Sequence, residues 1–319
     1  MMDTAFSVQP VPGLSQLVAD VQSRPQRDAH VIVFANEKGG VGKSTLAFHA
    51  AVALANAGAA VLAIDCDSRQ RSLHMALENR RATKTCLGIA LACPRSAVVD
   101  RAATAALFQE MGRLGTRCRF ILIDAPGHDS PLARAAIAVA DTLVTPVNPS
   151  FIDLAHLGRF NPATMALTAT GPFGALVAGL QQERERQGIR PADWLLLKNR
   201  VRPHEARQQE RVDQALAALA SKLGARIGSG FAERVGYREL FAFGLTHPDL
   251  DRIPQLGAVK PREPQEVDRM LAELRLPPVG LPTPREQASR AWVQAQTRTA
   301  YLNALKDHVA PHGGLRARA

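Results

Sequence analysis

The residues best placed to do chemistry lie in one glycine-rich run, Lys38-Gly39-Gly40-Val41-Gly42-Lys43-Ser44-Thr45. Glycines let backbone N–H groups converge on phosphate oxygens, and the N-terminus of a following helix adds the positive end of its dipole. Lys43 would neutralise the β- and γ-phosphates, while the Ser44 hydroxyl would complete the coordination shell of Mg²⁺. The run therefore predicts a binding site for a nucleoside triphosphate and magnesium.

The loop carries a second lysine that the usual phosphate-binding loop lacks. A standard G-x-x-x-x-G-K-[ST] loop needs glycine at position 37, whereas this chain has Glu37 followed by Lys38. The pattern K-G-G-x-x-K-[ST] is that of the deviant Walker A class. Resemblance to this class implies an ATPase that dimerises face to face, with Lys38 reaching the nucleotide held by the partner subunit.

Polar residues at the ends of three apolar runs support the loop. Asp65 could hold Mg²⁺ through water, and Asp67 could position the attacking water. Asp124 is suited to the metal as a Walker B carboxylate, and the Gly127 N–H to the γ-phosphate. Asn199-Arg200 is suited to adenine recognition, because an amide can both donate and accept at the base edge. The metal ligands predicted are therefore the Ser44 hydroxyl and the carboxylates of Asp65 and Asp124.

Near-continuous apolar runs must position these residues. Such runs separated by helical segments indicate a parallel sheet that is covered on both faces. We expect an α/β fold with a twisted parallel sheet, of the P-loop NTPase type. The loop should open a helix over residues 46–57, and the expected strands cover residues 30–35, 60–65, 120–124, 142–147 and 194–198.

Composition narrows the class of protein. Hydrophobic residues make up 46% and charged residues 21% of 319 residues, as in ordinary soluble proteins, and no apolar stretch reaches the length of a membrane span. The four cysteines form no C-x-x-C pair, which argues against cluster ligation and fits a reducing cytoplasm. A net charge of +10 favours nucleic acid or another anionic surface as a partner, and the scarcity of tyrosine and tryptophan favours duplex backbone contact over base stacking.

Basic residues are concentrated in the second half of the chain. Between residues 183 and 238 there are twelve Lys or Arg and seven Asp or Glu, an excess of five. Arg207 and Arg211 lie four apart on a predicted helix and so share a face. A solvated helix face explains such charges equally well, because Glu210 and Asp213 lie among them. The candidate DNA contacts are Arg207, Arg211, Lys222, Arg226, Arg234 and Arg238.

The chain divides into four expected parts. Residues 1–28 have no signal-peptide pattern and are expected to form a flexible extension. Residues 29–276 should form the ATPase domain, and the proline-rich residues 277–284 a linker. Residues 285–319 should contain a helix and a basic tail. The apolar face of that helix is mostly alanine, so we expect it to pack on protein rather than to anchor in a membrane.

Several further stretches resemble the ParA/MinD superfamily, and most closely its MipZ family of division-plane positioning ATPases. They include Asp65-Cys66-Asp67-Ser68-Arg69-Gln70-Arg71 and lie within residues 30–275, namely residues 36–40, 65–71, 78–82, 120–124, 148–151, 199–200 and 237–246. Ala125 departs from the pattern, because many relatives carry a hydroxyl residue there.

The resemblance implies a cytoplasmic, nucleoid-associated ATPase that uses ATP and Mg²⁺. Its ATP-bound homodimer would bind DNA non-specifically and inhibit assembly of the tubulin homologue FtsZ, and its monomer would bind a ParB-like centromere-binding protein. Catalytic roles would fall to Asp67, Lys38 and Lys43. The alternative within the superfamily is a ParA-type ATPase that partitions chromosomes or plasmids.

Overall fold

The computed structural model describes residues 13–24, 28–99, 104–201, 206–233, 235–253 and 265–278, all within one compact unit that spans residues 1–279. The side chains of residues 206–208 and 235 are not described. Most of the expected linker and the whole expected helix and tail at 285–319 lie outside the described residues. Among the described helices, none combines the length and apolar character needed to cross a bilayer.

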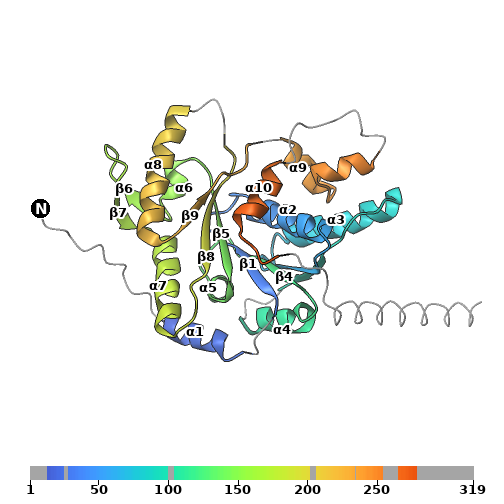
Figure 1. Ribbon diagram of the computed structural model, residues 1–319, viewed down its shortest axis with the longest axis horizontal. Helices are drawn as coiled ribbons and strands as arrows, with labels where there is room; N and C mark the ends of the chain where they lie inside the picture. The colour runs from blue at the N-terminus through green and yellow to red at the C-terminus, as the bar shows by residue number, and fades with distance from the viewer. Residues whose placement is uncertain are drawn as a thin grey trace, which may run out of the picture. The chain divides into compact units, whose positions relative to one another are not determined.

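A seven-stranded parallel sheet forms the centre of the molecule, in the order β3-β2-β4-β1-β5-β8-β9, and a separate antiparallel hairpin pairs β6 with β7 (Figure 1). The central strands are buried on both faces, which explains their near-continuous apolar sequences. The strands are β1 (His30–Phe34), β2 (Val61–Asp65), β3 (Arg95–Val98), β4 (Phe120–Asp124), β5 (Thr142–Val147), β6 (Gly158–Phe160), β7 (Leu167–Thr170), β8 (Asp193–Lys198) and β9 (Arg226–Gly228).

Helices cover both faces of the sheet, and each face has its own apolar cluster. One cluster includes residues of α1, α4, α5, α7 and α8, and the other includes residues of α2, α3, α9 and α10. This arrangement confirms the predicted α/β fold. The helices are α1 (Leu14–Gln22), α2 (Lys43–Asn56), α3 (Ser72–Leu87), α4 (Thr104–Gly115), α5 (Pro131–Val139), α6 (Phe151–Leu154), α7 (Pro172–Arg186), α8 (Ala206–Leu223), α9 (Val235–Ala242), the 3-10 helix η1 (His247–Arg252) and α10 (Gln265–Glu273).

The five expected strands appear as β1, β2, β4, β5 and β8, with ends that shift by at most one residue. The sequence did not predict β3, β9 or the hairpin. These strands have three or four residues, and several of their residues are polar, so they lack the apolar run that identified the others. Their existence depends on pairing with strands that are already in place.

Part of the expected flexible extension is a helix. Leu14 and Val18 of α1 are buried, and their spacing of four residues places them on one side of the helix. They pack against α7 and α5, and Gln187 donates a 3.0 Å hydrogen bond to the Ser15 carbonyl. Figure 1 shows α1 beneath the end of α7. The expectation of flexibility is therefore wrong for residues 14–22.

Candidate nucleotide site

The glycine-rich loop joins the end of β1 to the start of α2, at the carboxyl edge of the sheet. This is the edge at which open parallel sheets bind ligands. Gly40 and Gly42 have φ values of 75° and 95°, a left-handed conformation that glycine adopts without steric cost. Gly42 is also the N-cap of α2, so the helix starts where the loop ends and its free N–H groups face the loop.

Lys43 is the first residue of α2, and its ammonium group lies inside the loop. Its Nζ donates a 3.2 Å hydrogen bond to the Lys38 carbonyl. Burial lowers the pKa of Lys43, against the raising effect of Asp124 and Asp67. A Cβ at Gly127 would lie 3.3 Å from Lys43 Nζ and 3.7 Å from the Gly39 Cα. Glycine at this position therefore leaves more room above the lysine, where a terminal phosphate would lie, than a residue with a Cβ.

Two carboxylates stand side by side next to this lysine. Asp65 and Asp124 are register partners at the carboxyl ends of β2 and β4, and both side chains are buried. Burial and the charge of Asp65 raise the pKa of Asp124 to about 7, although the Ser44 hydroxyl and Lys43 oppose the rise. Neither oxygen of Asp124 has a donor in hydrogen-bond geometry within the described residues. A buried carboxylate in this state is stabilised by a cation, so the residues fit Mg²⁺.

The neighbouring acidic residues hold the turn before α3. Asp65 accepts hydrogen bonds from the backbone N–H groups of Asp67 (2.9 Å) and His74 (3.1 Å), one at each oxygen. Asp67 Oδ1 accepts from the N–H groups of Arg69 at 3.1 Å and Gln70 at 3.0 Å. Both oxygens of Asp65 are therefore engaged in holding the turn, which fits a contact to the metal through water, whereas Asp67 keeps one oxygen available to a water molecule.

Lys38 does not point into the chain's own phosphate site. Its ammonium group forms an ion pair with Asp153 of α6, a carboxylate that is 4% exposed. Its backbone N–H donates to Asn36 Oδ1 at 3.0 Å, and Asn36 Nδ2 donates to the Pro146 carbonyl at 2.8 Å. Sequence reasoning assigned no role to Asn36 or Asp153. Asn36 lies within the stretch at residues 36–40 that carries the superfamily resemblance. Asp153 lies two residues after the stretch at 148–151.

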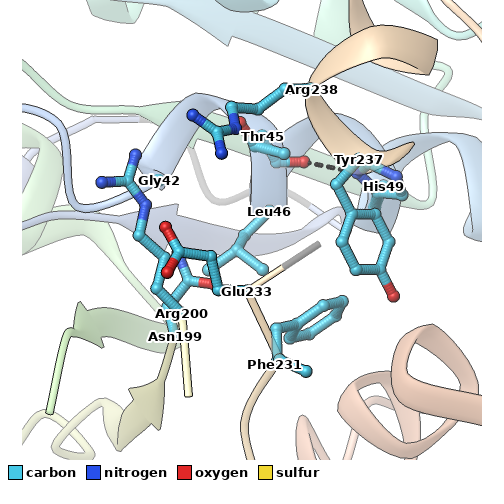
Figure 2. Close-up of a pocket in the computed structure, with 11 residues that line it drawn as sticks. Gly42, Thr45, Leu46, His49, Asn199, Arg200, Phe231, Glu233, Tyr237 and Arg238 are labelled. Atoms are coloured by element: carbon cyan, nitrogen blue, oxygen red, sulfur yellow. Dashed lines mark hydrogen bonds between the residues drawn. The ribbon is translucent and has the colours of Figure 1, made fainter. Parts of the chain in front are cut away.

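A pocket lies beyond the loop, where a base attached to the phosphates would reach (Figure 2). Asn199 lines it and donates from Nδ2 to the Val41 carbonyl at 2.7 Å, so its amide also ties β8 to the loop. One of the two N–H groups of Nδ2 is thus occupied, and the amide oxygen remains as an acceptor. The oxygen can accept from the amino group that adenine presents at its N6 edge, which agrees with the adenine recognition predicted from the sequence.

Aromatic residues that the sequence analysis did not select form the inner wall of this pocket. The rings of Phe231 and Tyr237 pack edge to face, with their centroids 5.6 Å apart. The ring of Tyr237 packs in the same way on His49 of α2, with a centroid separation of 5.1 Å. His49 is fully buried, and its Nδ1–H donates a 2.8 Å hydrogen bond to the Thr45 carbonyl. Burial lowers the pKa of His49 to about 4. Figure 2 shows Tyr237 beside His49, with the hydrogen bond to Thr45 drawn as a dashed line.

The outer wall carries two exposed arginines. Arg200 has a φ of 54°, a left-handed conformation that costs energy for a residue with a Cβ. Arg238 of α9 lines the same pocket. The cavity volume is about 50 Å³, less than a purine ring occupies.

A comparison with known protein families shows to which family the chain belongs. Residues 30–278, well over half of the chain, match the family described as ATPase MipZ. The chain belongs to the MipZ family of ATPases. Membership makes this protein an ATP hydrolase of the ParA/MinD superfamily, as the two-lysine loop predicted.

More distant similarities agree with the fold of this MipZ-family protein. It is 26% identical to an uncharacterized ATP-binding protein of Methanocaldococcus jannaschii. The aligned 188 residues cover 53% of this chain and 71% of that protein. Among solved structures it resembles a McdA–ATP complex of Cyanothece (TM-score 0.54, 19% identity, 80% of this chain and 100% of that one). It also resembles the MinC:MinD cell division protein complex of Aquifex aeolicus (TM-score 0.50, 20% identity, 79% and 98%). At such identities these structures show the fold alone.

Two of the MipZ-like stretches, residues 78–82 and 237–246, pack against each other. Asn79 Nδ2 donates to the Ala242 carbonyl at 2.9 Å, and Arg80 Nη1 donates to the Gly244 carbonyl at 2.9 Å. Arg80 also makes a two-pronged ion pair with Asp249, at 2.6 and 2.9 Å, with both side chains buried. These contacts join α3, which follows the acidic turn, to α9, which carries the pocket residue Tyr237.

The described candidate DNA contacts of the MipZ-family protein lie on several elements. Arg211 is exposed on α8, where it donates to the Pro162 carbonyl at 2.6 Å, and Lys222 is exposed near the other end of the helix. Arg226 forms an ion pair with Asp193 at the start of β8, and Arg238 lines the base pocket. Arg234 and the side chain of Arg207 lie outside the described residues. The role of these residues in DNA binding therefore stays a prediction.

Proposed function

We propose that this MipZ-family ATPase is a nucleotide-switched homodimer that positions the cell-division plane. The observation that supports the switch is the position of Lys38. Its ammonium group belongs to the loop, yet it lies against Asp153 and not among the acidic residues around Lys43. Lys43 occupies the phosphate site of the same chain, and the Lys38 side chain is 30% exposed. Lys38 is therefore available to a nucleotide bound by a second subunit.

Different residues around Lys43 would bind the phosphates, hold the metal ion and orient the attacking water. Lys43 and the backbone of residues 38–45 hold the phosphates, and Gly127 bounds the terminal one. Ser44 directly, with Asp65 and Asp124 through water, would hold a Mg²⁺ ion that neutralises phosphate charge. Asp67 would orient the attacking water from its second carboxylate oxygen. Asn199 and Arg200 would bind the adenosine end.

The further partners follow from family resemblance and from charge. The ATP dimer would bind DNA without sequence preference, through exposed cations such as Arg211 on α8, and so associate with the nucleoid in the cytoplasm. The dimer would inhibit FtsZ assembly, and the monomer would bind a ParB-like protein. A ParA-type partitioning ATPase remains the second candidate, because it uses the same loop and the same dimer.

Lys38→Ala tests the switch directly. The variant should bind ATP nearly as wild type does but remain monomeric, because the lost contact is made across the dimer. Size-exclusion chromatography with ATPγS and with ADP, followed by DNA retardation of each species, measures dimerisation and DNA binding together. The matched control is Lys84→Ala, which removes an exposed lysine of α3.

Each outcome of this experiment is informative. Normal dimerisation of Lys38→Ala with ATPγS would contradict the proposed role of the second lysine. Co-sedimentation of the wild-type dimer with FtsZ polymers, scored as loss of polymer, separates division-plane positioning from partitioning. An ATP dimer that binds a ParB-like protein and leaves FtsZ assembly unchanged would favour the ParA-type reading.

Removing the charge of Asp67 should slow hydrolysis without weakening ATP binding. Asp67→Asn keeps an oxygen that can accept from the N–H groups of Arg69 and Gln70, so the turn before α3 should persist. Because positioning supplies most of the catalysis of phosphoryl transfer, turnover at saturating ATP should fall about tenfold or more. Asp67→Ala, which also removes the turn contacts, serves as the comparison. Wild-type turnover in both variants would remove Asp67 from the mechanism.

A further inference from the structure

A second cavity lies at the opposite edge of the sheet from the nucleotide site. Its wall includes the first residues of three strands, His30 of β1, Thr142 of β5 and Asp193 of β8. The wall is completed by residues near the ends of α7 and α10, Arg184 and Arg275 among them. The cavity volume is about 540 Å³, within the range of small-molecule sites. With strands of five or six residues at about 3.3 Å each, roughly 15–20 Å separate it from the phosphate loop.

The acidic groups of this cavity already have partners. Asp141 Oδ2 accepts a 2.8 Å hydrogen bond from the Val31 N–H. Asp193 receives both prongs of the Arg226 guanidinium, at 2.7 and 2.5 Å. Asp193 is therefore paired with a cation outside the cavity wall, whereas Asp141 keeps its charge and offsets part of that of Arg184.

Arg184 is a buried cation without a carboxylate partner among the described residues. It is 7% exposed and is held by backbone carbonyls alone: Nε donates to Arg190 (3.0 Å), and Nη1 to Ala138 (3.1 Å) and Ala140 (2.6 Å). Burial lowers its pKa, with Asp141 opposing the change. Within the described part of the chain, its Nη2 has no hydrogen-bond acceptor and is not sealed from solvent. A guanidinium fixed in place with one nitrogen open is prepared to receive an anion.

Two more arginines border the same cavity. Arg190 and Arg275 are exposed, and neither forms an ion pair with any described residue. Arg275 has a φ of 48°, at a position after α10 where glycine is normally favoured. The side chains of Arg190 and Arg275 are therefore available to an anion that Arg184 also contacts.

We infer that this cavity binds a small polyanion that carries at least two phosphate groups, of the pyrophosphate or nucleotide class. Three arginines without carboxylate partners converge on one space, and planar guanidinium groups bind phosphate oxygens in pairs. The recessed position of Arg184 favours a compact phosphate compound over the backbone of duplex DNA. The site is separate from the phosphate loop and does not depend on the proposed function.

Titration calorimetry with inorganic pyrophosphate tests the inference on the full-length chain. The variant Lys43→Ala removes the phosphate loop as a binding site and should retain one pyrophosphate site. Adding Arg190→Glu and Arg275→Glu to it should raise the Kd at least tenfold, and the remaining binding should weaken with salt. The control pair Arg95→Glu and Arg113→Glu makes the same change in net charge at exposed positions elsewhere.

Three further results decide the matter. In an otherwise wild-type chain, the Arg190→Glu, Arg275→Glu variant should hydrolyse ATP at the wild-type rate, because both residues lie at the far edge of the sheet. Equal pyrophosphate affinity of this pair and the control pair, each in the Lys43→Ala chain, would overturn the inference. Loss of DNA retardation with unchanged pyrophosphate binding would also overturn it, and would assign the arginines to DNA.

Discussion

Lys43→Ala is expected to abolish ATP binding at micromolar concentrations. Its ammonium group lies in the loop, where the Lys38 carbonyl at 3.2 Å is its one hydrogen-bond partner among the described residues, so it can turn to phosphate at little cost. Hydrogen bonds to charged groups contribute about 1.5–3 kcal/mol each. The loss of contacts to two phosphates should therefore raise the Kd by on the order of 100-fold. Titration with a fluorescent ATP analogue measures this change.

A matched pair of variants makes the result specific. Lys38→Ala removes the other lysine of the loop and should leave the Kd for the monomer within about threefold of wild type, because Lys38 pairs with Asp153 in the free chain. Equal losses in the two variants would mean that both lysines serve the same subunit's nucleotide. The assignment of one lysine to each subunit would then be wrong.

Asp249→Ala is expected to destabilise the fold by about 3–5 kcal/mol, the cost of leaving a buried ion-pair partner alone. Arg80 is fully buried, and two of its nitrogens bind Asp249. Asp249 also accepts hydrogen bonds from the N–H and the hydroxyl of Thr246, both at 2.7 Å. Urea unfolding of the two proteins gives the difference in the free energy of unfolding. Asp251→Ala, at an exposed position of the same 3-10 helix, should cost less than about 0.5 kcal/mol.

The same pair predicts a dependence on pH. Burial opposes ionisation of Asp249, but the Arg80 guanidinium and Thr246 hold its pKa below the ordinary value of 3.8. A lowered folded-state pKa adds stability that is complete above the unfolded-state pKa and disappears as pH falls through the folded-state pKa. The difference between wild type and Asp249→Ala should therefore be constant above about pH 5 and shrink below pH 4. A difference that grows in acid would contradict this role.

The sequence by itself determined the sheet and the phosphate loop. Strands β1, β2, β4, β5 and β8 are apolar runs buried on both faces, a pattern that is visible in the chain without knowledge of neighbours. The loop at 38–45 is likewise local, because its glycines, lysines and helix N-terminus are consecutive residues. The carboxyl ends of parallel strands share an edge, so the chain order of Asp65 and Asp124 also predicted that they would meet.

Only the tertiary structure decided which partner each charged residue has. Lys38 meets Asp153 and Arg80 meets Asp249, across separations of 115 and 169 residues, and Arg226 meets Asp193 at the far edge of the sheet. Short sequence patterns cannot show such pairs, because an ion pair depends on the distance between two side chains in space and not on their separation in the sequence. For the same reason the arginines at the amino edge appear in the sequence as scattered residues, and become a cavity wall only when α7, α10 and three strands are assembled.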